Sequence, residues 1–588
     1  MKTWYSVALG PGLTYYAPAL SRRIHWPAAI NLLSSFTFAS SLERKARWLI
    51  FAGGFAIALA FAAYTQHAWE DYYITYRVSK NLATGHGLVY TVGERVHVFT
   101  SPLNVMVPAA LSIITGNTSD ELVLWLFRGV SGLLLAGAAV LLFASARKNS
   151  LSPIPTVVLI GLFALDAKIV DFSINGQEAA FMVFFLALAL HALTVSSDWT
   201  FLKLGLAGAG LMWTRPDGFI YFGAVALGFL VFNAGRTIGQ SRLGLLKIFL
   251  GAGALTTVLY LPWLLWAWHY YGSPVPHTII AKRVFQTLST LQPEPLFVDL
   301  ITFPFSVLLG LTSADNTFLP PNALLFGGWH WTVVLYGKCL AYVCALYWCL
   351  PFGRPQGRAV SFAFMLSHFY LSCIAPYVAA WYLPSCTILG VFVFAQVLQH
   401  GLDLAPSLKH RGANLFRHCT ALVRAVAVSA LFITLLMLLC SAYQLRIQQR
   451  EIEEGLRKQI GLWLRQNAAS PKDTVLLEPL GYIGFFSQLK MLDLPGLSAP
   501  EVVAAERRLK SVNPGKLIPE LRPDWLVIRS EEAGQIQAVT PRLLTEAYSA
   551  VKIFDVSERL ASYHWLPGRG YLGYDETYIV FKRNQSRP

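Results

Sequence analysis

The sequence has 588 residues, of which 55% are hydrophobic and only 13% are charged. A soluble domain is usually nearer one quarter charged, so this composition excludes a typical soluble enzyme, a disordered chain and a collagen-like fibre. The net charge of +15 would suggest nucleic acid in a soluble protein. Here, however, the basic residues lie in short loops between apolar segments, as in loops that face anionic cytoplasmic lipid. We therefore predict a membrane protein that binds membrane lipids and no nucleic acid.

Apolar stretches that could cross a bilayer as helices, which takes about 20 residues, recur from residue 48 to residue 443. We count about eleven. Two further apolar stretches, 102–115 and 296–312, are short and bounded by proline, and we expect them to lie in the interface or to re-enter from one side. The eleven predicted spans are 48–65, 121–146, 153–170, 179–196, 199–214, 218–234, 247–269, 331–351, 359–378, 381–399 and 424–443.

The positions of the basic residues test this count, because cytoplasmic loops are enriched in lysine and arginine. With residues 1–47 inside, every predicted inner loop carries such residues. If residues 102–115 crossed the membrane, Arg147 and Lys148 would lie outside. The rule therefore favours eleven spans and places the C-terminal end of the chain outside. The inner-loop residues are Arg147, Lys148, Lys203, Arg236, Arg242, Lys247, Arg354, Arg358, Lys409, Arg411 and Arg417.

Residues 444–588 differ from the rest of the chain, because they hold 17 of the 32 acidic residues. They begin with a polar amphipathic stretch, 446–468, that predicts a helix. Short runs rich in β-branched and aromatic residues then predict strands. We therefore expect a small extracytoplasmic α/β domain. The predicted strands are 474–477, 524–528 and 577–581.

The predicted architecture is thus a polytopic α-helical membrane protein with a C-terminal extracytoplasmic α/β domain. Most acidic residues of the membrane region fall in outer loops and turns, which suggests that any chemistry takes place outside the cytoplasm. The predicted parts are a cytoplasmic N-terminal segment at 1–47, a membrane domain at 48–443 with large outer loops at 66–120 and 270–330, and the α/β domain at 444–588.

Two adjacent acids, Glu70 and Asp71, follow the first predicted span. Carboxylates are costly to place near hydrocarbon, so this pair needs an explanation. Asp71 could cap the helix that is expected to run to Ala83, but capping does not explain Glu70. The polar residues that follow the pair are also unusual for a simple connection between membrane helices.

The segment Glu70–Leu103 reads EDYYITYRVSKNLATGHGLVYTVGERVHVFTSPL. It resembles the first outer loop of the GT-C glycosyltransferases that use polyprenyl-phosphate sugars. Within them it is most similar to the arabinofuranosyltransferases of bacterial envelopes, which include terminal arabinofuranosyltransferases and type IV pilin arabinosyltransferases. The family usually has Asp-Asp where this chain has Glu-Asp, and Asp71 takes the second position.

Further segments resemble the same family in the same order, so that the resemblance covers most of residues 66–530. His277 stands where the family has asparagine. The resemblance implies the GT-C fold and transfer of a sugar from a lipid phosphate. The matching segments are Ser173–Glu178, Thr214–Gly218, Tyr271–Lys282 and Gly461–Leu497.

Such a transfer needs a carboxylate that takes the proton of the attacking hydroxyl or stabilises an oxocarbenium ion. It also needs cations on the leaving phosphate. On the resemblance, we expect Asp71 to be the catalytic carboxylate and Glu70 to orient the acceptor or assist. The expected donor-phosphate and substrate-binding residues are Lys282, Arg215, Arg77, Glu178, Asp217, His277 and His86, with Lys80 and Arg283 as further phosphate partners.

Structural explanations remain open for several of these residues. Arg215 could form a local ion pair with Asp217, and Glu178 could simply favour a helix N-terminus. Arg77 could only neutralise the acid pair. Some members of the superfamily use a divalent metal, but the spacing of histidines and acids here does not favour one, so we expect no metal and no certain cofactor. The histidines considered as ligands beside Asp71 and Glu178 are His86, His97 and His277.

The predicted function is transfer of D-arabinofuranose from a polyprenyl phosphate donor to an extracytoplasmic glycan or glycoprotein acceptor. The protein would lie in the inner (cytoplasmic) membrane, with its active site on the outer side. One alternative is a GT-C transferase for another lipid-phosphate sugar, such as mannose or an aminosugar. A second is a transporter or flippase for a lipid-linked sugar, which would predict charges inside the spans and repeated halves.

Overall fold

The computed structural model describes residues 26–195, 197–235, 239–289, 298, 301–302, 313–321, 329–375, 378–409 and 413–584. The chain forms two compact units, Met1–Ala52 and Gly53–Pro588, and each is considered by itself. In the first unit the described residues belong to the long helix α2, Trp26–Thr65. The second unit contains the other helices, the sheet and the candidate site.

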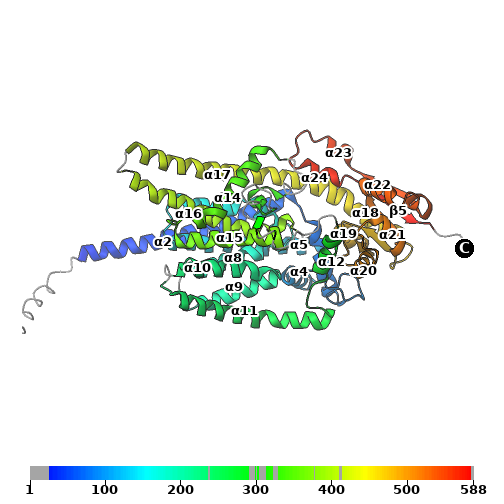
Figure 1. The fold of residues 1–588 in the computed structure, drawn as a ribbon, viewed down its shortest axis with the longest axis horizontal. Helices are drawn as coiled ribbons and strands as arrows, with labels where there is room; N and C mark the ends of the chain where they lie inside the picture. Colours follow the sequence, from blue (N-terminus) through cyan, green and yellow to red (C-terminus); the bar gives the residue numbers. More distant parts are fainter. Residues whose placement is uncertain are drawn as a thin grey trace, which may run out of the picture. The chain divides into compact units, whose positions relative to one another are not determined.

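Helices occupy all eleven predicted spans. In Figure 1 the helices α8, α9, α11 and α15 follow the long axis of the picture; α9 packs between α8 and α11, and α15 packs against α10 and α16. The helices before the C-terminal domain are α2, α3 (Glu70–Ala83), α4 (Pro102–Ile114), α5 (Asp120–Lys148), α6 (Pro153–Leu165), α7 (Ala167–Ile174), α8 (Ala179–Thr194), α9 (Thr200–Thr214), α10 (Gly218–Val231), α11 (Arg242–Tyr271), α12 (His277–Leu288), α14 (Trp331–Leu346), α15 (Pro355–Phe369), α16 (Pro384–Lys409) and α17 (Ala413–Gln448).

The multi-pass helical architecture is confirmed, but the number of spans stays a prediction. Among the described residues, six helices are long and apolar enough to cross a membrane, or seven if α7 and α8 together form one broken span. Helix α10 occupies a predicted span but has only 14 residues. At 1.5 Å per residue such a helix measures about 21 Å, less than the roughly 30 Å of a hydrocarbon core.

Residues 102–115 form a short helix, α4, as expected. Its 13 residues begin with a proline at the first helical position, and the Ser101 hydroxyl accepts a hydrogen bond from the backbone N–H of Asn104. This is the capping arrangement that starts helices. The other predicted interfacial segment, 296–312, lies outside the described residues except for residues 298, 301 and 302.

A sharp turn separates α7 from α8, whose axes are bent by 120°. The turn contains Gly176, which has a φ of +99°. A Cβ at this position would lie only 2.6 Å from the side chain of Tyr72 in α3. Only glycine therefore fits here, and the turn can approach the helix that carries the acid pair.

The C-terminal α/β domain is confirmed, with two strands that sequence patterns missed. Its first predicted residue, 444, lies inside α17, which continues through the π-helix η7 (Gln449–Arg457) into the domain. The strands are β1 (Thr474–Leu477), β2 (Lys490–Asp493), β3 (Trp525–Arg529), β4 (Tyr548–Asp555) and β5 (Thr577–Arg583), and the helices are α18 (Lys458–Asn467), α19 (Leu480–Ser487), α20 (Pro500–Leu509), α21 (Pro514–Leu521), α22 (Ser530–Val539), α23 (Ser557–Ala561) and α24 (Arg569–Tyr574).

The five strands form one sheet in the order β2-β1-β3-β5-β4. Strand β1 is parallel to both β2 and β3, whereas β5 runs antiparallel to β3 and β4. Because side chains alternate along a strand, Leu476 and Leu526 face one core and Val475 and Val527 face the other. The second core also contains Ile74 of α3. The sheet and α3 are therefore held by one continuous hydrophobic core.

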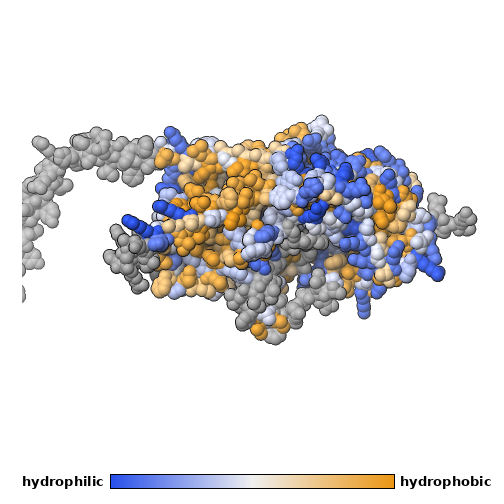
Figure 2. Space-filling view, turned by 90° about the horizontal axis from the view of Figure 1, so that it is seen from above, coloured by the Kyte–Doolittle hydropathy of each residue, from blue (hydrophilic) through white to orange (hydrophobic). Residues whose placement is uncertain are grey.

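The surface differs between the long helices and the C-terminal domain. In Figure 2, hydrophobic residues gather over the long helices, and hydrophilic residues are concentrated toward the end that holds the C-terminal strands. Many apolar side chains of α11 are exposed, among them Leu250, Val258 and Leu265. A contiguous exposed apolar surface on long helices is what a lipid-facing region requires.

Candidate active site

The acid pair lies in the first turn of α3, where carboxylates interact favourably with the helix dipole. The residue before it, Trp69, begins the helix without a side-chain cap. Its indole N–H donates to Asp171 Oδ1 over 3.0 Å, and its backbone N–H donates to the carbonyl of Asn175 over 3.0 Å. These two bonds attach the start of α3 to the turn between α7 and α8. Asp71 is therefore not the cap that it could have been.

Asp71 lies among charged groups from three other parts of the chain. Burial raises the pKa of its carboxyl group. Lys282 of α12 and a hydrogen bond from the Gln177 side chain act in the opposite direction, while Glu178 and Glu478 raise the pKa further. The structure thus places a carboxylate, a lysine and a second acid in one region.

Glu70 makes a direct contact with the C-terminal domain. Its carboxylate accepts a hydrogen bond from the backbone N–H of Gly481, in the first turn of α19. Burial raises the pKa of Glu70 well above its usual range; Arg457 opposes this, and Asp71 and Glu478 add to it. Glu70 therefore has a structural partner, Gly481. The sequence had suggested only that Glu70 orients the acceptor or assists.

Arg215 forms a saturated ionic cluster beside the acid pair. Its guanidinium bonds Glu178 Oε1 over 2.9 Å and both oxygens of Asp217 over 2.9 and 3.2 Å. It also lies over the ring of Tyr382, 3.8 Å from the centroid. The hydroxyl of Tyr370 donates to Asp217 over 3.1 Å. The structural explanation raised for Arg215, a local ion pair with Asp217, therefore applies.

Lys282 connects this cluster to Asp71. The ammonium group interacts electrostatically with Asp71 and with Tyr382, the same ring on which Arg215 lies. The structure therefore brings together six of the expected residues, although they come from four separate segments. These residues are Glu70, Asp71, Glu178, Arg215 and Lys282, with Asp217 attached through Arg215.

Arg77 is not grouped with these residues by any of the contacts above, and its expected role at the donor phosphate stays a prediction. Its side chain is buried and donates to the carbonyls of Gly484 and Leu489 over 2.8 and 3.0 Å. The guanidinium also lies over the ring of Tyr90. Arg77 therefore fastens α19 to α3 through two of its five N–H groups.

The other expected substrate-binding residues also lie elsewhere. His86 is exposed and bonds the hydroxyl of Thr84, and Lys80 pairs with Asp120 over 2.8 Å. His277 begins α12 beside the C-terminal domain, where burial lowers its pKa and the backbone of Gly496 hydrogen-bonds its ring. None of these positions is among the largest influences on the pKa of Asp71.

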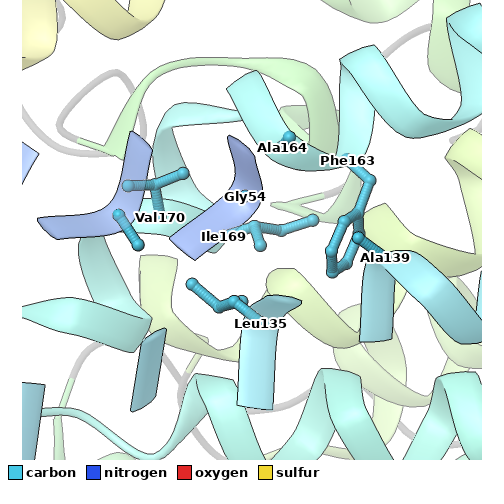
Figure 3. A pocket seen from close by; sticks show the side chains of 8 residues that line it. Gly54, Leu135, Ala139, Phe163, Ala164, Ile169 and Val170 are labelled. Carbon is cyan, nitrogen blue, oxygen red and sulfur yellow. The ribbon is translucent and has the colours of Figure 1, made fainter. Parts of the chain in front are cut away.

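Two hollows lie away from the acid pair. A very small apolar void of about 10 Å³ is enclosed by helices of the membrane region, with Leu135 and Phe163 in its wall (Figure 3), and is too small for a substrate. A groove of about 640 Å³ lies between α12 and α20 and is lined by Arg283, Arg507 and Lys510 among apolar residues. Arg283 therefore faces this groove and not Asp71.

Metal ligands are not grouped in the part of the chain that the structure describes, where no cluster of three or more histidine, cysteine or acidic residues could hold an ion. His97, which we considered as a ligand, is instead buried with its ring stacked on Tyr271. Independence of a metal stays a prediction.

Sequence patterns missed three side chains at the site. Gln177 and Tyr370 had no distinctive spacing, and their roles depend on contacts across the chain. Glu478 did have a signal, because a charged residue directly follows the buried strand β1. Ligands of open α/β sheets bind at the carboxyl ends of parallel strands.

The chain has the fold of GT-C membrane proteins, with an acid pair in the first turn of α3 and an α/β domain that follows the membrane helices. Its structure resembles that of the Archaeoglobus fulgidus oligosaccharyltransferase in the apo form, with a TM-score of 0.52 and 14% identity, covering 87% of this chain and 73% of the other. ArnT from Cupriavidus metallidurans bound to undecaprenyl phosphate is a further neighbour, with a TM-score of 0.48, 12% identity, and coverage of 94% and 99%.

In sequence, the chain is similar to the terminal beta-(1->2)-arabinofuranosyltransferase of Corynebacterium glutamicum. The two are 28% identical over an alignment that covers 43% of this chain and 38% of that enzyme. The match thus spans less than half of the curated relative. Residues 444–580 also match a family model described as a domain of unknown function, DUF8728. The expected similarity to GT-C enzymes, and to arabinofuranosyltransferases among them, is confirmed.

The contact between Glu70 and Gly481 can be tested by one added methyl group. A Cβ at Gly481 would overlap the backbone carbonyl of Glu70. We expect Gly481→Ala to destabilise the contact between α19 and α3 by about 1–3 kcal/mol, the usual cost of overpacking, and to speed amide hydrogen exchange in both helices. Gly534→Ala is the control, because a Cβ there meets nothing within 4 Å. Equal exchange in the two variants would contradict the expectation.

Proposed function

We propose that this protein is a membrane glycosyltransferase that moves D-arabinofuranose from a polyprenyl phosphate to a hydroxyl of an extracytoplasmic glycan or glycoprotein. The single observation that carries the proposal is the grouping of Asp71 with Lys282 and the cluster around Arg215, on segments next to the α/β domain. The similarity to an arabinofuranosyltransferase supports the choice of sugar, and the lipid carrier and the inner-membrane location remain part of the proposal.

In the proposed reaction, an acceptor hydroxyl attacks the anomeric carbon of the donor. The new C–O bond forms as the bond from that carbon to the phosphate oxygen breaks, and the phosphate leaves with the bonding electrons. Asp71 takes the hydroxyl proton. Lys282, which interacts electrostatically with Asp71, stabilises the charge on the leaving phosphate.

Arg215 takes a different role from the one that the sequence suggested. Two carboxylates already neutralise it, so we propose that it holds Glu178 and Tyr382 in place. Tyr382 then presents an aromatic ring close to Lys282. Such a ring can pack against the apolar face of a sugar while leaving its hydroxyls to polar groups.

The direct test is transfer by detergent-purified protein from polyprenyl-phospho-arabinofuranose to neutral arabinofuranoside acceptors. The matching mannose and aminosugar donors are assayed in parallel. Turnover with the arabinofuranose donor alone would support the complete proposal. Turnover with another donor alone would keep the mechanism and replace the sugar. No turnover with any lipid-phosphate sugar would overturn the proposal and favour the transporter alternative.

The proposal also predicts how activity depends on pH. Asp71 must be deprotonated to take a proton, so kcat/KM falls as the pH falls through its pKa. Because burial raises this pKa, the fall should begin at a higher pH than for an ordinary aspartate, whose pKa is about 3.9. Lys282→Met removes a charge that lowers the pKa of Asp71, so it should shift the fall to a still higher pH.

Arg283→Met is the matched control for this pH shift. It removes the same charge from the next residue of α12, whose side chain is exposed and lines the groove beside α20. A profile of Lys282→Met that coincides with the profiles of wild type and Arg283→Met would contradict the proposed position of Lys282.

A further inference from the structure

The carboxyl ends of three strands meet at the edge of the sheet that carries Glu478. Strands β1, β2 and β3 are mutually parallel through β1. Their last residues are Leu477, Asp493 and Arg529, and Glu478 follows the first of these directly. In open α/β sheets, this edge is where ligands bind.

The same edge adjoins the acid pair. Gly481, three residues after Glu478, donates its backbone N–H to Glu70. Tyr482, the next residue, reaches back with its hydroxyl to the carbonyl of Ala68 over 2.9 Å. These contacts hold the connection between β1 and α19 against the start of α3, so Glu478 has a defined position beside the proposed catalytic centre.

Arg529 fixes the Glu478 carboxylate on one side. The guanidinium bonds Glu478 Oε2 over 2.7 Å, and it is itself held by Asp575 over 2.7 Å and by Glu532 over 2.9 Å. The Arg529 side chain is only 4% exposed, whereas that of Glu478 is 51% exposed. Glu478 is thus anchored by a buried arginine and still open to solvent, which is the state of a side chain that can receive a ligand.

We propose that Glu478 is the residue by which the C-terminal domain binds the acceptor, and that this acceptor is an uncharged polyol whose hydroxyls donate hydrogen bonds to the carboxylate. The proposal rests on the proposed function and adds one residue and one substrate class to it. A carboxylate only accepts hydrogen bonds, and bonds from hydroxyls to an ionised acceptor are strong. It would repel an anionic acceptor, because like charges at short range are unfavourable.

The negative charges around the site favour an uncharged acceptor. Glu478 is among the groups that raise the pKa of both Glu70 and Asp71, so all three acids share one region. A phosphorylated acceptor would add a further negative charge to that region, whereas sugar hydroxyls add donors and no charge. The lysine that balances Asp71 is assigned to the donor phosphate and so does not serve the acceptor.

Glu478→Gln tests the proposal, because it keeps the shape of the side chain and removes its charge. The probes are a neutral octyl arabinofuranoside disaccharide and the same compound with one phosphate group. We expect the dissociation constant and KM of the neutral probe to rise about 10- to 100-fold, the loss typical of one charge-assisted hydrogen bond. The KM of the donor should not change. Preference for the neutral probe over the phosphorylated one should also decrease, which a purely structural role would not produce.

Controls separate this result from misfolding and from failure of the proposed function. Glu531→Gln removes another exposed acid of the same domain and should behave like wild type. Glu478→Asp retains the charge and should keep the preference for the neutral probe even if it binds less tightly. Binding is measured without donor, so it reports on Glu478 even if no transfer is observed. Unchanged binding and unchanged preference in Glu478→Gln would overturn the proposal.

Discussion

Asp71→Asn should lower kcat about 100- to 10,000-fold, the range that a general base usually contributes. The amide has nearly the same shape as the carboxylate and cannot take the acceptor proton. The first turn of α3 should remain folded, since Trp69 and Glu70 keep their bonds to its neighbours and the amide oxygen of the variant can still accept from Gln177. The measurement is the rate of transfer at saturating donor and acceptor, with binding of both substrates measured in parallel.

A matched control distinguishes loss of the base from a general loss of negative charge. Glu121→Gln neutralises an exposed acid in the first turn of another helix, α5, and should leave kcat within about twofold of wild type. A variant Asp71→Asn with near-normal kcat would show that another group takes the proton. Glu478 would not be the replacement to examine first, because its proposed role is in acceptor binding.

Arg457→Met should be the most destabilising substitution considered for the C-terminal domain. The arginine bonds Glu453 over 2.9 Å and Asp575 over 2.7 Å, and all three side chains are buried. Removing one partner of a buried ionic network leaves uncompensated charge and typically costs about 3–5 kcal/mol. We expect that loss to appear as faster amide hydrogen exchange in β3 and β5, which report the unfolding of this domain.

Arg465→Met is the control for that experiment. It makes the same substitution on the exposed side of α18, the next helix, where surface changes usually alter stability by less than about 0.5 kcal/mol. Similar exchange in the two variants would show that the network around Asp575 adds little to stability. Glu70→Gln in the Arg457→Met background would then show whether the opposing effect of Arg457 on Glu70 matters for activity.

Local patterns were sufficient to place most elements of this fold. Apolar stretches predicted the membrane-region helices, either as parts of spans or, for α4, as a short helix. The exceptions are α3 and α12, which are not apolar stretches. Ser101 and Pro102 marked the start of α4. Strand β1 begins and ends at the predicted residues, whereas β2 and β4 were missed. Strand β4 is exposed along much of its length, so its residues lack the apolar run that marks a buried strand.

Residue types identified the acid pair, and the resemblance to GT-C arabinofuranosyltransferases pointed to Lys282 and the turn around Arg215, because these features lie within short segments of the sequence. What each side chain does depended on partners hundreds of residues away. Arg77 was expected at the donor phosphate, and in the structure it donates to the carbonyls of Gly484 and Leu489. The position of Glu478 near Glu70 depends on the packing of α19 against α3.

The physical reason for this division is the range of the interactions. Helix formation, capping and burial along a strand depend on neighbours within a few residues, so they can be inferred from the sequence. The assignment of a charged side chain to a substrate or to a structural bond depends on which carbonyls and counter-ions the packing of α3, α12 and the sheet brings within hydrogen-bond distance. The positions of these groups are fixed by the hydrophobic core that Ile74 of α3 shares with Val475 of the sheet. This core forms only in the tertiary structure.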